Sequence, residues 1–181
     1  MLMTVDELKR YISTQEDAQA LEARLSALEL LIRAYTHNNF QQRHVRRMAD
    51  IAGSVVIMDA LQPFRVGDTI QVTESDFNDG LYTVTEANDS TITIKESTFD
   101  EDNVLVTRVV YPADVKMGAV NLMKWELERR DKAGIASETL SRHAVTYESM
   151  TEDNSIMGYP KSLMGFLRPY MRARFGQGVR A

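Results

Sequence analysis

The apolar positions near the N-terminus follow a helical period. Between Glu16 and Asn38 they step by three and four residues, which places them on one face of a helix of about six turns. They are Ala18, Leu21, Leu25, Leu28, Ile32 and Tyr35. Leu30 and Leu31 widen this stripe and indicate more than one packing neighbour. The stripe spans only about three heptads, which favours a core helix of a small bundle over a coiled coil.

The charged residues of this segment fall mostly off the stripe, and we expect them to lie in water. They are Glu16, Glu22, Arg24, Glu29 and Arg33. Ser13 and Glu16 have the spacing of a capping box, which predicts a helix start there, and His37–Asn39 predicts a left-handed end. Thr4 and Glu7 repeat the capping-box spacing ahead of a short amphipathic helix that reaches Ile12.

The middle of the chain alternates apolar and polar residues with period two. A strand is predicted over Ala52–Met58. Further strands carry Ile70 and Val72, Tyr82 and Val84, Ile92 and Ile94, and the run Val104–Val110. Asn78-Asp79-Gly80 and Asn88-Asp89-Ser90 predict turns. The spacing of about ten residues per strand favours an antiparallel meander or a small barrel.

Helical spacing returns after Pro112. Asp114 is a plausible N-cap for a helix that continues through Trp125, a core anchor, to Arg130. Residues 143–147 are expected to be extended. Pro160 can occupy the first position of a last helix, and Pro169 should kink or divide it. The apolar face of that helix is predicted to be Leu163, Phe166, Leu167 and Tyr170.

The predicted fold class is therefore α+β. A small bundle of about four helices, residues 1–40 and 112–175, carries an all-β antiparallel insertion at residues 41–111. Residues 176–181, which contain Gly176 and Gly178, are expected to form a flexible extended tail.

Charge is unevenly distributed along a chain whose net charge is −5. Residues 66–103 contain ten acids and one base, Lys95, whereas residues 159–181 contain five bases and no acid. Such segregation predicts either two solvated surfaces or two faces that meet different partners.

Motifs for catalysis or cofactor binding are not found in the sequence. It has no cysteine, which fits a reducing compartment, and its three histidines are far apart. Phosphate-binding glycine loops and a nucleophile elbow are also missing. We expect no cofactor, no metal site and no catalysis. The N-terminus does not resemble a signal peptide, and no apolar run reaches the ~20 residues of a membrane span.

Four segments, in this order, resemble the head–tail connector (head-completion or adaptor) proteins of long-tailed bacteriophages. They are MTVDELKRYI with the long helix that follows it, the Pro112–Lys116 segment with the helix through Trp125, KAGIASETLSRHAVTYES, and GYPKSLMGFLRPYMRARFG. The insertion between Gln41 and Tyr111 is longer than in the minimal members of that family.

This resemblance implies a structural virion protein at the head–tail interface, assembled in the host cytoplasm. Family members form rings, usually twelvefold, beneath the portal; the rings extend the DNA channel and offer a platform for the stopper or tail proteins. No catalysis, cofactor or membrane is involved, and DNA passes through without being read.

Two groups of residues are candidates for such roles. The C-terminal segment mixes arginines with large apolar side chains, as interface centres do, and is predicted to dock onto a neighbour such as the portal. Its candidate residues are Arg168, Tyr170, Met171, Arg172, Arg174 and Phe175. Part of the acidic cluster is predicted to line or flank a channel, where like charge keeps DNA from sticking. Its candidates are Glu74, Asp76, Asp79, Asp100, Glu101 and Asp102.

Two alternatives stay open. Arg43, Arg46 and Arg47, with the basic tail, are candidates for a DNA-binding module, although a charged link at a domain edge is favoured because aromatic residues for base stacking are missing from the cluster. A hydrolase or transferase of unknown type is the other alternative.

Overall fold

The computed structural model describes residues 1–129, 137–140, 143–146 and 153–173. The chain divides into two compact units. One comprises Met1 with Asn39–Tyr111, and the other comprises Leu2–Asn38 with Pro112–Ala181. The predicted limits of the insertion, residues 41 and 111, lie within two residues of these bounds.

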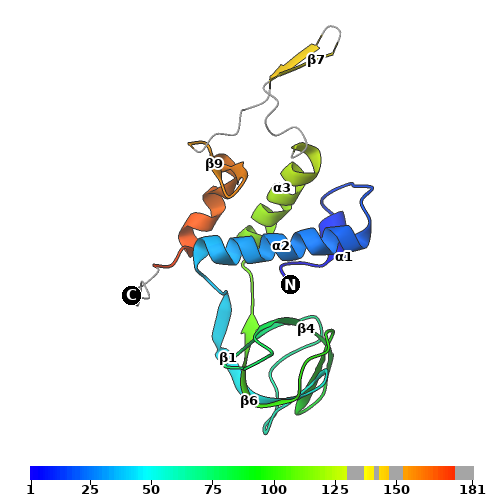
Figure 1. The fold of residues 1–181 in the computed structure, drawn as a ribbon, viewed down its shortest axis with the longest axis vertical. Helices are drawn as coiled ribbons and strands as arrows, with labels where there is room; N and C mark the ends of the chain where they lie inside the picture. The colour runs from blue at the N-terminus through cyan, green and yellow to red at the C-terminus, as the bar shows by residue number, and fades with distance from the viewer. Residues whose placement is uncertain (130–136, 141–142, 147–152, 174–181) are drawn as a thin grey trace. The chain divides into compact units, whose positions relative to one another are not determined.

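The first unit is a closed, six-stranded antiparallel barrel (Figure 1). Its strands are β1 (Gln41–Ala52), β2 (Val55–Ile57), β3 (Thr69–Thr73), β4 (Gly80–Ala87), β5 (Thr91–Ile94) and β6 (Glu101–Val109). They are ordered β1-β2-β5-β4-β3-β6, and β6 closes the barrel onto β1. Only β3-β4-β5 is a meander, so of the two predicted architectures the barrel is the correct one. Closure gives every strand of the barrel a neighbour on each side.

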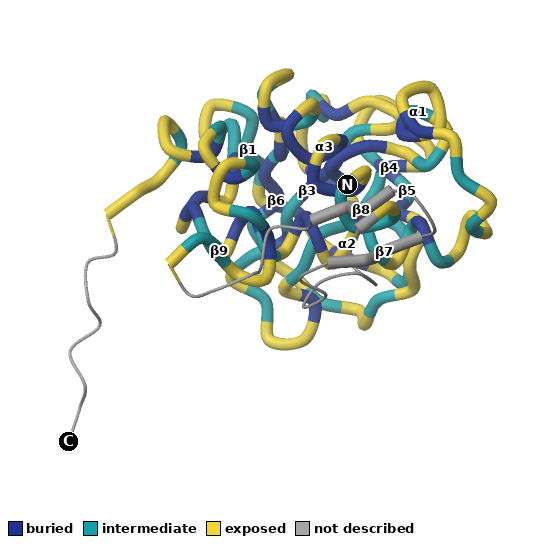
Figure 2. Tube along the Cα trace, turned by 90° about the horizontal axis from the view of Figure 1, so that it is seen from above, coloured by how far each residue is buried: buried dark blue, intermediate teal, exposed yellow. Residues whose placement is uncertain are grey.

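Alternate residues of the barrel strands fill its interior. Ile70 and Val72 on β3, Ile92 and Ile94 on β5 and Val84 on β4 are at most 2% exposed. Intermediate or exposed residues separate them along each strand (Figure 2). This is the period-two pattern seen in the sequence, and it explains why the strand positions could be predicted.

The basic cluster near residue 45 is part of this barrel. Arg46 pairs with Thr107 and Arg47 with Val106, so the cluster lies in the first half of β1. The prediction of a link is wrong for this segment. Charged residues interrupt the apolar alternation there, which hid the strand in the sequence.

The second unit contains the helices of the described chain. Helix α1 covers Val5–Lys9 and α2 covers Ala18–Thr36. Thr4 caps α1 as predicted, because its hydroxyl accepts from the Glu7 amide at 3.1 Å. Helix α2 instead begins after Asp17, whose carboxylate accepts from the Ala20 amide at 2.9 Å. The predicted start at Ser13 is therefore too early.

The apolar stripe of α2 is confirmed at its centre. Leu21, Leu25, Leu28 and Ile32 are at most 1% exposed, whereas Ala18 is exposed and Tyr35 half-buried. His37 ends the helix in the left-handed conformation, with φ of 51°. The expectation that Glu29 and Arg33 lie in water is wrong, since they are 4% and 8% exposed. The Leu2 amide donates to Glu29 Oε2 at 3.1 Å, so the N-terminal residues cover this side of the helix.

Helix α3 spans Ala113–Arg129, and its first residue precedes the predicted cap Asp114. Asp114 Oδ1 accepts from the Val115 amide at 3.0 Å. Two short hairpins follow in the chain. One pairs β7 (Ser137–Leu140) with β8 (His143–Thr146), which confirms the extended prediction for residues 143–146, while Tyr147 lies outside the described residues. The other joins β9 (Ser155–Ile156) to β10 (Tyr159–Pro160).

The last helix, η2, is a 3₁₀ helix over Lys161–Tyr170, and Pro160 is its N-cap rather than its first residue. Met164 and Leu167 are its buried residues, while Leu163 and Phe166 are half-buried. A 3₁₀ helix aligns residues three apart, which fits the full burial of Met164 and Leu167; Met164 was not part of the predicted face. Helix η2 continues through Pro169 to Tyr170, so Pro169 does not divide it.

The described residues thus show an α+β protein with four helices and a six-stranded antiparallel barrel. The tail predicted at residues 176–181 lies outside them. Among the described helices, none combines the length and the apolar character that crossing a membrane requires.

Candidate protein-docking surfaces

Two loops meet at one end of the barrel. The β3–β4 loop, residues 74–79, contacts the segment 95–100 that joins β5 to β6. The β1–β2 turn lies at the same end, because the Gly53 amide donates to Asp100 Oδ1 at 2.8 Å. Phe40 and Tyr111, where the chain enters and leaves the barrel, lie at the opposite end of the strands.

Asn78 fastens the two loops together. Its Nδ2 donates to the Phe99 carbonyl at 3.0 Å, and its Oδ1 accepts from the Phe99 amide at 3.0 Å. Its own carbonyl accepts from the Tyr82 hydroxyl at 2.8 Å. Asn78 is only 2% exposed, so these bonds replace water that the side chain has lost. A residue predicted only as a turn former therefore holds two loops in one geometry.

Glu101 provides a second anchor. Its carboxylate accepts from the Ser75 hydroxyl at 2.6 Å, the Asp76 amide at 2.6 Å and Asn78 Nδ2 at 2.8 Å. The hydrogen bond from Ser75, with those from the loop amides and Asn78, holds the pKa of Glu101 below its ordinary value. The β3–β4 loop is consequently organised around a charged carboxylate at neutral pH.

These anchors present two phenylalanines to solvent. Phe77 is 72% exposed and Phe99 is 68% exposed, yet their ring centroids lie 5.8 Å apart in a tilted arrangement. Scattered single apolar residues are normal on a protein surface, but two aromatic rings in contact on hydrogen-bonded loops form a contiguous apolar feature. We call Phe77 and Phe99 the aromatic knob.

Five carboxylates lie on or beside the two loops that carry the aromatic knob. We call them the acidic rim, and they are Asp76, Asp79, Glu96, Asp100 and Glu101. Burial, followed by the charges of Glu96, Asp79 and Glu101, raises the pKa of the neighbouring Tyr82 phenol. The fold therefore brings acids that are separated along the chain to one end of the barrel.

The candidate channel-lining acids have unequal surroundings. Asp79 Oδ1 accepts from the Ser75 amide at 3.1 Å, and Asp100 and Glu101 accept the bonds described above. Glu74, with φ of 62°, and Asp102 are exposed. The wider acidic cluster also includes a structural member, Asp68, which pairs with Arg108 at 2.7 Å. The role of these acids along a channel stays a prediction.

Sequence patterns did not reveal the aromatic knob. Phe77 and Phe99 are 22 positions apart, and their meeting depends on the strand order of the barrel. A usable signal was present, since each phenylalanine stands in a polar turn beside an acid, as Asp76-Phe77-Asn78 and Phe99-Asp100. A large aromatic residue in a polar turn either reaches into the core, as Phe64 does at 3% exposed, or is a candidate for binding.

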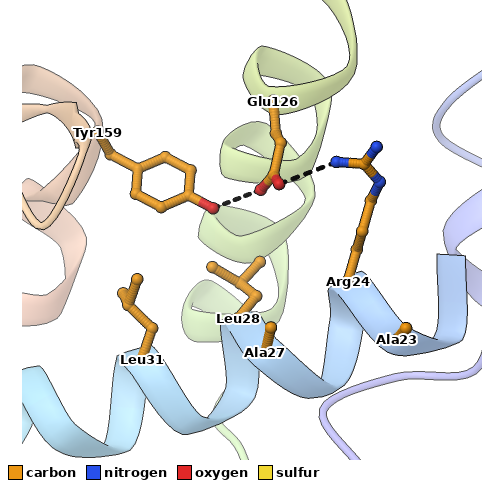
Figure 3. Close-up of a pocket in the computed structure, with 7 residues that line it drawn as sticks. All are labelled: Ala23, Arg24, Ala27, Leu28, Leu31, Glu126 and Tyr159. Carbon is orange, nitrogen blue, oxygen red and sulfur yellow. Dashed lines mark hydrogen bonds and ion pairs between the residues drawn. The ribbon is translucent and has the colours of Figure 1, made fainter. Parts of the chain in front are cut away.

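The helical unit carries a second surface, an open groove of about 380 Å³ along α2 (Figure 3). Its lining residues are Ala23, Arg24, Ala27, Leu28, Leu31, Glu126 and Tyr159. Glu126 of α3 lies between Arg24, at 3.1 Å, and the hydroxyl of Tyr159, which donates to it. The three charged and polar groups join α2, α3 and β10, whereas the alanines leave one side of α2 apolar and open to solvent.

The C-terminal docking candidates are partly engaged within their own unit. The Tyr170 hydroxyl donates to both carboxylate oxygens of Asp114, at 2.7 and 2.8 Å, and this hydrogen bond raises the pKa of Tyr170. The Tyr170 carbonyl accepts from Asn38 Nδ2 at 3.1 Å, and the Arg172 amide donates to the Thr36 carbonyl at 2.8 Å. Tyr170 therefore has a structural role, whatever it contacts elsewhere.

Other members of that group remain available to a partner. Arg168, Met171 and Arg172 are exposed, and Met171 is 48% exposed. Arg174 and Phe175 lie outside the described residues. Of the described candidates, Tyr170 therefore belongs to the packing of the helical unit, whereas Arg168, Met171 and Arg172 stay candidates for docking.

The arginines of β1 are unevenly exposed. Arg43 is exposed, whereas Arg46 Nε donates to Thr107 Oγ1 at 3.0 Å and Arg47 Nη1 donates to the Arg46 carbonyl at 2.9 Å. Part of the cluster is thus committed to contacts within the barrel.

Comparison with protein families and with curated sequences does not identify the protein. No protein-family model matches it, and no curated protein sequence matches it. Among the described residues, no three histidine or acidic side chains are grouped to hold a metal ion.

Proposed function

We propose that this protein is a structural subunit of a phage head–tail connector, a ring beneath the portal that extends the DNA channel. The aromatic knob carries the proposal, because two exposed rings on anchored loops form a feature suited to binding another protein. The type of assembly, a ring at the head–tail interface, is inferred from the resemblance of four ordered segments to connector proteins.

In this proposal the helical unit acts as a small bundle and forms the body of the ring. The packing of α2 against α3 and η2 supports this role, since it gives the unit a core of its own. The open apolar side of α2, with Leu30 61% exposed, is a further surface that a neighbouring subunit can cover.

The proposed partners are further copies of the chain, twelve in the virion, the portal protein, and the stopper or tail-completion protein. The subunit assembles in the host cytoplasm and resides at the head–tail interface. DNA passes through the ring without sequence-specific contacts, and no catalysis or cofactor is required.

The second sequence hypothesis, a DNA-binding module, draws on Arg43, Arg46, Arg47 and the basic tail. The contacts of Arg46 and Arg47 within the barrel give it no specific support. Its distinguishing property would be binding to random duplex DNA that weakens steeply with salt.

A gene disruption in the parent phage tests the proposal. Without the protein we expect separate heads and tails, with infectious particles restored when the gene is supplied from a plasmid. Complete, infectious particles in its absence would refute a connector role. A failure before DNA packaging would instead indicate an earlier function in head assembly.

A further inference from the structure

The aromatic knob has an electrostatic complement elsewhere in the same chain. Its acidic rim contributes five carboxylates on or beside the loops that carry the two exposed rings. Residues 159–173, which we call the basic segment, contain Lys161, Arg168 and Arg172 and no acid, and all three side chains are exposed. Opposite charge on two surfaces steers them together and sets their orientation.

The apolar parts of the two surfaces also match. Met171 is 48% exposed and lies between Pro169 and Arg172, with Arg168 one helical turn earlier. Methionine sulfur makes favourable contacts with aromatic rings, and methionine with arginine is enriched at interface centres. A surface of this composition suits two phenylalanines on loops that also carry carboxylates.

Both surfaces are fixed before they meet a partner. Asn78 and Glu101 hold the loops of the knob, and the Tyr170 and Arg172 backbones hold the basic segment against α2. Association therefore orders few additional groups, which lowers its entropic cost.

We propose that the aromatic knob of one copy docks onto the basic segment of a second copy, with Phe77 and Phe99 against Met171. Because the two surfaces differ, the contact is heterologous and repeats from copy to copy. Repetition closes into a ring if the rotation permits, or continues as a filament if it does not. The proposal rests on the connector function for its ring, and it assigns the acidic rim to protein contact rather than to the channel.

Charge reversal provides the test. The acid variant D76K/E96K and the base variant R168E/R172E change exposed side chains only. We expect each variant alone to self-associate at least about tenfold more weakly than the natural protein in sedimentation and native mass spectrometry, as loss of a contact centre does. In a mixture of the two variants we expect association to be regained in part, because the unaltered knob of the base variant can meet the unaltered basic segment of the acid variant.

Truncation of the rings is a second arm. F77A/F99A should weaken association comparably, whereas L61A should not. Leu61 is a matched control because it is also 72% exposed but lies near the β4–β5 turn, at the other end of the barrel. Circular dichroism of every variant establishes that the fold is retained.

Three results would overturn the docking proposal: reversal variants that associate like the natural protein, a mixture that stays dissociated, or a natural protein that is monomeric both alone and in the presence of portal. Loss of portal or stopper binding by F77A/F99A with self-association intact would assign the knob to that other protein, and so would also overturn it. Rings that obey the charge rules but never bind portal would leave this contact standing and refute the connector function.

Discussion

The rings of Phe40 and Tyr111 pack against each other at a tilt of 44° where the chain enters and leaves the barrel, with centroids 4.8 Å apart. They are 6% and 4% exposed, and the Val110 amide donates to the Phe40 carbonyl at 3.0 Å. Phe40 adopts a left-handed conformation with φ of 51°, which is uncommon for a bulky residue and is held by this packing. The two chain segments that enter and leave the barrel are thus held together at this end of the strands, and the insertion forms a self-contained unit.

The barrel should therefore fold alone. A fragment of residues 39–111 is expected to give a β-sheet circular dichroism spectrum and a cooperative thermal transition, because every strand keeps both neighbours. Removing only residues 67–110 from the whole chain is the informative comparison. The shortened protein should aggregate or unfold, because β1 has then lost its partner β6 and β2 its partner β5. A disordered 39–111 fragment would show that the barrel depends on the helical unit.

The strands could be predicted because their burial alternates, but the barrel could not be chosen over a meander. The pairing of β2 with β5 and of β3 with β6 depends on contacts between distant segments. Turn chemistry was informative at Asn88, whose amide donates to the Thr91 carbonyl at 2.9 Å. At Asn78 the same residue type also bridges to another loop, which local sequence does not reveal.

Leu28 tests the core of the helical unit. Replacing this 1% exposed residue with alanine should lower the free energy of unfolding by about 2–5 kcal/mol, through lost burial and the cavity left behind. Leu30→Ala on the same helix is the control, because Leu30 is 61% exposed. Urea denaturation of both variants checks this, and equal losses would contradict the assignment of the stripe.

Gly118 tests the packing of α3 against η2. A methyl group built on Gly118 would lie 2.4 Å from the ring of Phe166, so the ring has to move. Helix propensity alone favours alanine over glycine by roughly 0.5–1 kcal/mol. We nevertheless expect Gly118→Ala to destabilise by about 1–3 kcal/mol, as overpacked sites do. Gly165→Ala, with open space around it, should be nearly neutral, and a stabilised Gly118→Ala protein would contradict the close approach.

The helix predictions failed where several similar signals compete. Ser13 and Asp17 are both good N-caps, and only the structure shows that Asp17 is used. In the sequence, Glu29 and Arg33 appeared to be on the solvent side of α2. The N-terminal residues cover Glu29, and no local sequence pattern predicts this contact. The docking surfaces were hardest to predict, because an exposed phenylalanine resembles a core residue in sequence.

Lowering the pH should loosen the loops that carry the aromatic knob, because the carboxylate of Glu101 becomes protonated. Its folded-state pKa is below the ordinary value of 4.5, so its anchoring bonds are complete above that pH and are lost as pH falls through the lower, folded value. Amide resonances of Asp76 and Phe99 should report this change between neutral pH and the acid limb. In Glu101→Gln the transition should vanish, while Val72 in the barrel core serves as the reference. A transition that persists in Glu101→Gln would assign it to another carboxylate.

Imaging the purified protein with the portal protein encoded in the same genome tests the connector function most directly. Negative-stain electron microscopy should show a ring of this protein coaxial with the portal and continuing its channel, twelvefold in class averages. Deleting residues 174–181, which leaves the Tyr170 and Arg172 contacts in place, separates the tail from the basic segment in the same assay. The connector function would be contradicted by portal particles that carry no added ring even when this protein is present well above its concentration in the host cytoplasm.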